Sequence, residues 1–85
     1  MMTQNKEKLM EVTVNLMSTF ARYMKNGNSK ITIKKGSTIR DLARQLRLPE
    51  KYVRIITVNG KQVDLDKMLS AGDIVFIFPP AIGGG

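Results

Sequence analysis

Polar and apolar residues alternate in two stretches in the first half of the chain. In residues 11–18, EVTVNLMS, a valine or leucine occupies every second position from Val12 to Leu16, which is the pattern of a strand with one buried face. Residues 30–34, KITIK, repeat the pattern with two isoleucines. The NGNS segment between them is rich in turn-forming residues, and residues 19–25 can form a short helical turn. The two stretches therefore predict a hairpin.

The hydrophobic period changes in residues 37–49, STIRDLARQLRLP. Apolar residues recur there at intervals of three and four, so that one face of a helix would carry Ile39, Leu42, Ala43 and Leu46. Thr38 and Asp41 have the spacing of a capping box, and Pro49 cannot continue a helix. We predict one helix of about three turns.

Short apolar runs separated by turn-forming residues fill the second half of the chain. We predict strands over residues 52–58, 61–63 and 74–78. Asn59 and Gly60, between the first two, both tolerate the positive φ of a type I′ hairpin turn. Residues 65–69 are expected to form one helical turn.

The resulting order, β, β, α, β, short β, β, predicts an α+β fold of the β-grasp, or ubiquitin-like, type, with a mixed four- to five-stranded sheet and one main helix. We expect a flexible leader in residues 1–9, the β-grasp domain in residues 10–80 and a flexible glycine tail in residues 81–85. No internal repeat or linker divides the chain.

The last predicted strand, IVFIF, is apolar on both faces, which predicts a central position in the sheet. We expect Ile74, Phe76 and Phe78 to point toward the helix. Val75 and Ile77 would then lie on the other face of the sheet as an apolar surface for a partner. The alternative is that residues 20–24 or 65–69 fold over that surface.

Composition excludes several kinds of chemistry. The 85 residues include no cysteine and no histidine, so the chain has no disulfide, thiol nucleophile, imidazole base or zinc site of the usual kind. The first residues lack the apolar core of a signal peptide and no apolar run is long enough to span a bilayer, so we expect a soluble, cytoplasmic protein without a membrane partner.

The net charge of +7 suggests an acidic protein, an anionic ligand or nucleic acid as a partner, or it serves solubility alone. Arg40, Arg44 and Arg47 resemble a basic stripe on the helix, although their spacing also fits an ordinary solvated face. Because aromatic residues are sparse, the composition favours a partner other than nucleic acid.

No candidate catalytic or metal group stands out within the domain. Asp64, Asp66 and Asp73 could hold a metal ion, but their positions beside turns favour a role in turn formation, so we predict no metal site. The serines have no histidine to activate them. We therefore do not expect the chain to be a catalyst.

The sequence after residue 78, PPAIGGG, is the remaining candidate. Pro79 and Pro80 give a stiff exit without amide donors, and Ala81 and Ile82 carry small and apolar side chains. Gly83, Gly84 and Gly85 have no side chains, so this tail could thread a narrow channel and present the carboxylate of Gly85 to another enzyme. The chain would then be a substrate.

Four segments resemble the ubiquitin-like sulfur carriers, which include the small subunit of molybdopterin synthase (MoaD) and the thiamine-pathway carrier (ThiS). They are VTVNLMSTFAR, GSTIRDLARQL, VNGKQV and, most specifically, GDIVFIFPPAIGGG. The Pro79-Pro80 exit and the FARYM segment are similar to the molybdopterin carrier, whereas a third terminal glycine is more like some thiamine carriers.

This resemblance implies a reaction cycle at Gly85. An ATP-dependent adenylyltransferase of the ubiquitin-activating type adenylates the terminal carboxylate, and a sulfur donor displaces AMP to leave a thiocarboxylate. The tail then enters the large subunit of molybdopterin synthase and gives its sulfur to a pterin precursor. ATP is used by the activating enzyme, and no cofactor is bound by the carrier itself. Val75 and Ile77 would dock both partners.

Four other functions remain open. The chain could serve thiazole synthase in the thiamine pathway or a tRNA-thiolation enzyme by the same chemistry. It could also be a ubiquitin-like protein modifier that ends on a lysine of another protein, or a basic β-grasp module that binds RNA.

Overall fold

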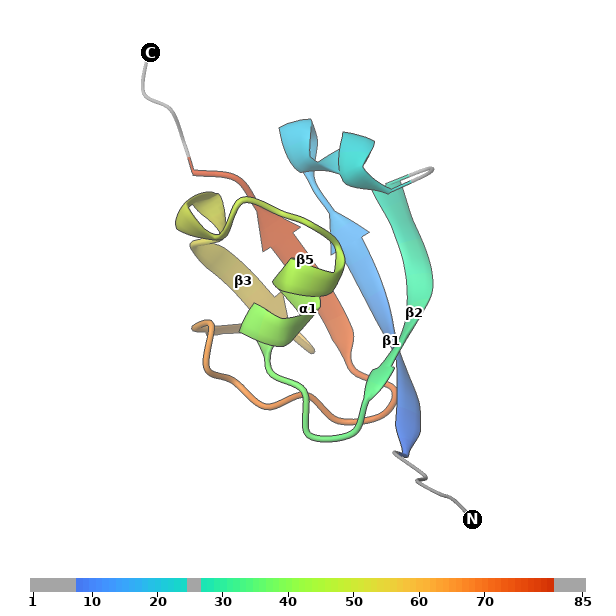
Figure 1. The fold of residues 1–85 in the computed structure, drawn as a ribbon. Coiled ribbons are helices and arrows are strands. Elements are labelled where there is room, and N and C mark those ends of the chain that lie inside the picture. The colour runs from blue at the N-terminus through green and yellow to red at the C-terminus, as the bar shows by residue number, and fades with distance from the viewer. Residues whose placement is uncertain (1–7, 25–26, 81–85) are drawn as a thin grey trace.

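The computed structural model describes residues 8–24 and 27–80 (Figure 1). Their elements, in chain order, are β1 (Leu9–Leu16), η1 (Ser18–Tyr23), β2 (Asn28–Lys34), α1 (Ile39–Gln45), η3 (Glu50–Tyr52), β3 (Ile55–Val58), β4 (Lys61–Val63) and β5 (Ile74–Phe78). The two elements named η are 3₁₀-helices.

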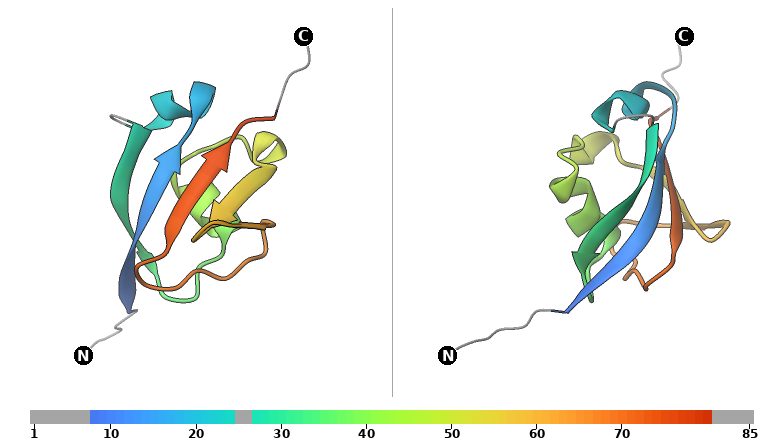
Figure 2. Two further views of the ribbon diagram at one scale, coloured as in Figure 1. Left: turned by 180° about the vertical axis from the view of Figure 1, so that it is seen from behind. Right: turned by 90° about the vertical axis from the view of Figure 1, so that its right-hand side faces the viewer.

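The five strands form one mixed sheet in the order β2-β1-β5-β3-β4. β1 and β5 run parallel, and the other three neighbouring pairs are antiparallel. α1 lies across one face of the sheet, and the view from behind shows that no helix among the described residues covers the other face (Figure 2). The predicted mixed sheet, first hairpin and central last strand are confirmed.

The core lies between α1 and the sheet. The first strand contributes alternate residues, as its pattern predicts, and α1 contributes Ile39, Leu42 and Ala43, all fully buried. Leu46 and Ile31 are partly buried against the same cluster.

The prediction for the two faces of β5 is wrong. Val75 and Ile77 have no exposed surface and belong to the core, whereas Ile74 is 46% exposed. The reason is register: Val75 lies beside Val14 and Ile77 beside Leu16 on β1, and residues side by side in neighbouring strands share a face. The strand is apolar on both sides, so its own sequence did not indicate which face meets the helix.

α1 is shorter than predicted because a capping motif ends it before Pro49. The N–H of Leu48 donates to the carbonyl of Ala43 at 2.9 Å, and the N–H of Arg47 donates to that of Arg44 at 3.0 Å, the hydrogen-bond pattern of a Schellman motif. Arg47 takes the left-handed conformation that this motif needs, with φ of 61°. At the other end, the predicted capping box between Thr38 and Asp41 is confirmed.

Residues 65–69 do not form the predicted helical turn. They run beside the start of α1, where the carbonyl of Lys67 accepts from the N–H of Ile39 and that of Leu65 from the N–H of Arg40, both at 3.0 Å. Residues 65 and 66 form a turn instead, closed by the N–H of Lys67, which donates to the carbonyl of Asp64 at 3.2 Å. The first amides of a helix have no partner within it, and the carbonyls of this segment satisfy two of them. Likewise, residues 50–52 form η3, and the predicted strand begins only at Ile55.

The hairpin turn between β3 and β4 is confirmed, with φ of 53° at Asn59 and 87° at Gly60. The Asn59 side chain also donates to the buried carboxylate of Asp73 at 2.9 Å and accepts from the N–H of Ile74 at 2.9 Å. The turn is thereby joined to the first residue of β5.

Candidate functional site

The candidate tail leaves the sheet at the end of its central strand. Phe78 is the last paired residue of β5, opposite Ile55 on β3, and Pro79 and Pro80 follow it, half-buried. Because proline has no N–H to donate, the strand ladder ends there. The other predicted tail residues, Ala81, Ile82, Gly83, Gly84 and Gly85, lie outside the described residues.

A strip of apolar side chains occupies the sheet face that α1 does not cover, and we call it the outward strip. Its members are Ile55, Ile74, Phe76 and Phe78. The two phenylalanine rings stack with centroids 6.4 Å apart and an angle of 19° between their planes. Ile55 is 40% exposed and lies opposite Phe78. These residues, and not Val75 and Ile77, form the apolar surface of this face, which runs along β5 to the residue before Pro79.

The outward strip is bordered on one side by polar and basic residues. Thr13 and Asn15 of β1 lie beside Ile74 and Phe76, and the exposed Lys30 of β2 lies beside Thr13. Such a surface suits a partner with an apolar centre and an acidic edge.

The arginines on α1 are engaged in ion pairs. Arg40 donates to Glu50 at 3.2 Å and to Asp66, and the Nε of Arg44 lies 3.7 Å from a carboxylate oxygen of Glu50. The hydrogen bonds that Arg40 donates to Asp66 and Glu50 raise the pKa of its guanidinium. This cluster joins α1 to η3 and to the turn at Asp66, so it has a structural explanation that needs no nucleic acid.

The three aspartates considered for a metal site each form hydrogen bonds or ion pairs within the fold. Asp66 pairs with Arg40, Asp64 accepts from the N–H of Asp66 at 2.9 Å, and Asp73 accepts from the N–H of Ser70 at 2.8 Å and from Asn59. Within residues 8–24 and 27–80, no three acidic side chains gather as a metal ion would require.

No helix of this part of the chain has the length and apolar character of a membrane span.

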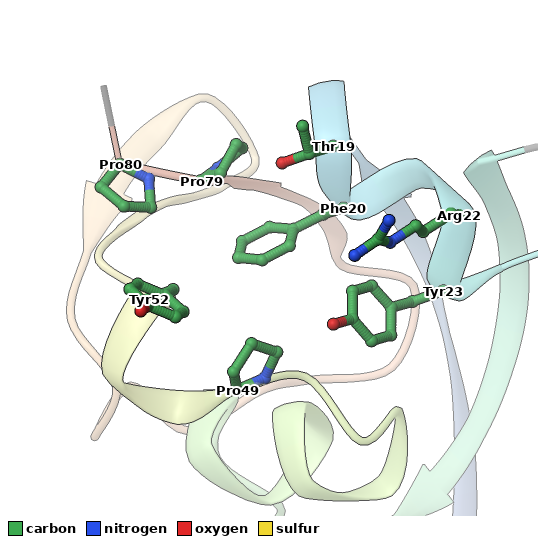
Figure 3. A pocket seen from close by; sticks show the side chains of 8 residues that line it. All are labelled: Thr19, Phe20, Arg22, Tyr23, Pro49, Tyr52, Pro79 and Pro80. Carbon is green, nitrogen blue, oxygen red and sulfur yellow. The ribbon is translucent and has the colours of Figure 1, made fainter. Parts of the chain in front are cut away.

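Sequence reasoning missed a cavity beside the tail exit (Figure 3). It has a volume of about 250 Å³ and is lined by Thr19, Phe20, Arg22, Tyr23, Pro49, Tyr52, Pro79 and Pro80. These residues come from η1, from η3 and the proline before it, and from the two prolines after β5, and no local pattern in the sequence links the three segments. The one feature of the sequence that the three segments share is their content of aromatic residues and proline.

The model of the family Ub-Mut7C, described as Mut7-C ubiquitin, matches residues 7–82 and so includes every strand and helix described above. The chain belongs to the Mut7-C ubiquitin family. No curated protein matches it significantly.

Solved structures similar to this Mut7-C ubiquitin chain confirm the ubiquitin-like β-grasp fold. A Pyrococcus furiosus protein assigned as molybdopterin converting factor, subunit 1, is 27% identical, with a TM-score of 0.68 over 85% of this chain and 99% of that one. The Haloferax volcanii protein HVO 2177 is 21% identical, with a TM-score of 0.78 over 96% of this chain and 93% of that one.

A third similar structure is SAMP1, a small archaeal modifier protein from Haloferax volcanii. It is 20% identical, with a TM-score of 0.66 over 87% of this Mut7-C ubiquitin chain and 99% of SAMP1. The fold is therefore shared by proteins named for molybdopterin conversion and for protein modification. The fold alone does not distinguish these two functions.

Proposed function

We propose that this chain is a sulfur carrier for molybdopterin biosynthesis, the pathway that makes the cofactor for molybdenum or tungsten. The observation that carries the proposal is that the sequence PPAIGGG follows the central strand β5, whose ladder ends at Phe78 because Pro79 has no N–H to donate. The 27% identity to a protein assigned as subunit 1 of molybdopterin converting factor, over nearly all of that protein, supports the same assignment.

The reacting group would be the carboxylate of Gly85. A carboxylate is a poor acyl donor, so an ATP-dependent adenylyltransferase of the ubiquitin-activating type first joins it to AMP, with release of pyrophosphate. A sulfur donor then attacks the acyl carbon and AMP leaves, which gives the thiocarboxylate. In this scheme the chain is a co-substrate and the large subunit of molybdopterin synthase is the catalyst that takes its sulfur.

The tail residues have separate tasks in this proposal. Gly83 and Gly84 make the tail thin enough to enter an active site, Ile82 anchors it there, and the two prolines hold it away from the sheet. The outward strip at the tail exit is the docking surface, in place of the buried Val75 and Ile77.

Intact-mass spectrometry tests the carrier chemistry. The full chain is incubated with an activating enzyme of this type, ATP and a sulfide source, and we expect a mass increase equal to the exchange of one oxygen for sulfur. A variant that lacks residues 84–85 should gain no sulfur, whereas a control that lacks residues 1–6 should gain it normally. Gain of sulfur by the variant without its glycines would contradict the proposal.

Protein modification is the second candidate, because the fold is shared with small archaeal modifier proteins. It predicts adducts joined to lysines of other proteins and no lasting gain of sulfur. For the sulfur acceptor, transfer to a pterin precursor in the presence of the synthase large subunit would support molybdopterin, and transfer only with thiazole synthase or a tRNA-thiolation enzyme would redirect the proposal within the same chemistry.

A further inference from the structure

The cavity at the tail exit is built from rigid parts. The N–H of Met17 donates to the carbonyl of Ile77 at 3.0 Å, which ties the start of η1 to the end of β5, and Ser18 turns the chain with φ of 54°. On the other side, the N–H of Tyr52 donates to the carbonyl of Pro49 at 2.8 Å. Proline fixes the backbone at three positions of the wall, so little order has to be gained when the cavity is filled.

The size and lining of the cavity select a single apolar side chain. Its volume of about 250 Å³ lies below the range of roughly 300–1,000 Å³ that is usual for cofactor and drug-sized ligands. Phe20 is 4% exposed, whereas Tyr23 and Tyr52 are 37% and 45% exposed. Figure 3 shows the two tyrosine rings on opposite sides of the cavity, with Pro79 and Pro80 above and Pro49 below.

Positive charge lies next to both tyrosines. The guanidinium of Arg22 is 5.9 Å from the ring centroid of Tyr23, and the ammonium of Lys51 is 5.2 Å from that of Tyr52. The eight lining residues include no carboxylate. Aromatic rings often bind cations, but here cations of the chain already lie near both rings, so a further cation would be repelled. A carboxylate beside the cavity would be attracted.

We propose that this cavity receives an apolar side chain, flanked by aspartate or glutamate, from the protein that takes up the tail. The identity of this partner rests on the proposed function. Pro79 and Pro80 form one wall of the cavity, so a protein that binds the chain at these prolines would lie beside the cavity. The side chain enters between Tyr23 and Tyr52, and its acidic neighbours pair with Arg22 and Lys51.

Nuclear magnetic resonance titration of the ¹⁵N-labelled full chain tests the proposal with synthetic peptides. The probe is the capped peptide Asp-Glu-Leu-Glu-Asp; one comparison peptide has serine in place of leucine, and a second has lysine in place of all four acids. We expect the probe to shift the amide resonances of residues 19–23 and 50–52 and to bind at least about tenfold more tightly than either comparison peptide.

Variants locate the binding to the cavity. Tyr52→Ala and, separately, Tyr23→Ala should each lower the affinity for the probe peptide about tenfold, because a large aromatic contact is lost. Both side chains are partly exposed, so the fold should persist, which the spectra check directly. Met68→Ala removes an exposed apolar side chain on the loop after β4, outside both the cavity and the outward strip, and should leave probe binding unchanged.

Several results would overturn the proposal. If the serine peptide bound as tightly as the probe, the cavity would not select an apolar side chain. If the lysine peptide bound as tightly as the probe, the cavity would not select acidic neighbours. Binding that appears only after residues 81–85 are removed would mean that the tail itself fills the cavity. The titration involves neither ATP nor sulfur, so its failure leaves the carrier proposal standing, and failure of the sulfur exchange leaves the titration result standing.

Discussion

Phe76 and Phe78 are large aromatic side chains on a sheet face that no described element covers. Their neighbours Val75 and Ile77, one position away along the strand, are completely buried. In a strand, a shift of one position exchanges the two faces, so each residue of β5 serves either the core or the surface. The division between stability and partner binding can therefore be tested one residue at a time.

The first prediction compares the two isoleucines of β5. Ile77→Ala should lower the free energy of unfolding by about 2–5 kcal/mol, because it removes buried methyl groups and leaves a cavity. Ile74→Ala should lower it by less than about 1 kcal/mol, because that side chain is 46% exposed. Urea denaturation measures both values. Equal losses would contradict the orientation of the strand.

At the scale of elements, α1 has only seven residues and depends on its ends. A helix of this length is marginal alone, so the capping box, the left-handed residue at its C-terminal end and the carbonyls of residues 65 and 67 each matter to it. Arg44 and Arg47 are both exposed and close in sequence, but one has helical geometry and the other has φ of 61°.

The second prediction is that glycine has opposite effects at these two positions. Arg47→Gly should stabilise the protein by about 0.5–1 kcal/mol, because glycine adopts positive φ without the steric cost of a side chain. Arg44→Gly should destabilise it by about 1 kcal/mol, because glycine is unfavourable inside a helix. Thermal unfolding followed by circular dichroism compares them. A loss of stability in both variants would count against the Schellman motif.

The third prediction concerns the stability of the folded protein at acidic pH. The backbone N–H and the hydroxyl of Thr38 donate to Asp41 and hold the pKa of its carboxyl below the ordinary value of 3.8. The folded state therefore favours the ionised form. This stabilisation is complete above the ordinary pKa and is lost as the pH falls through the lower pKa of the folded state.

Asp41→Asn removes this contribution at every pH. We expect the variant to be less stable than the parent above pH 3.8 and the difference to shrink at lower pH. Urea midpoints measured on both proteins across this range give the comparison. A difference that stays constant with pH would show that the carboxyl charge has no role in the cap.

For the whole molecule, the excess of fourteen basic over seven acidic residues acts over a longer range than any contact. The paired arginines of α1 are partly neutralised, whereas Lys30 of β2, which lies beside Thr13 at the border of the outward strip, is exposed. Under the proposed function, this lysine would act on the approach of an acidic partner surface.

The fourth prediction is a salt-dependent association rate with the activating enzyme. Lys30→Glu should slow association at low salt and have little effect on dissociation, because a charge at the edge of an interface acts mainly on the encounter. Lys67→Glu, on the loop after β4, serves as the control. Surface plasmon resonance at several salt concentrations measures both rates.

A separate binding measurement tests the nucleic-acid alternative. RNA binding that persists in a variant without residues 84–85 would favour that alternative.

Much of this architecture follows from local patterns in the sequence. The alternation in β1, the capping box at Thr38 and the turn at Asn59 all depend on neighbouring residues, and all three are confirmed. The orientation of β5, the pairing of residues 65–69 with the start of α1 and the cavity near Tyr23 and Tyr52 depend on residues far apart in sequence. Register and tertiary hydrogen bonds set these features, and a local pattern does not contain them.

The parallel pairing of β1 with β5 has a practical consequence for handling the protein. β1 has eight residues and its last residue lies beside Ile77, so the start of β1 is roughly 25 Å from the point where the chain leaves β5. Material joined ahead of Leu9, such as an affinity tag, a dye or another folded domain, enters at the opposite end of the sheet from Pro79. Immobilisation through that end should hold Pro79 and Pro80 away from the support, and it offers a fixed orientation for single-molecule measurements of partner binding under the proposed function.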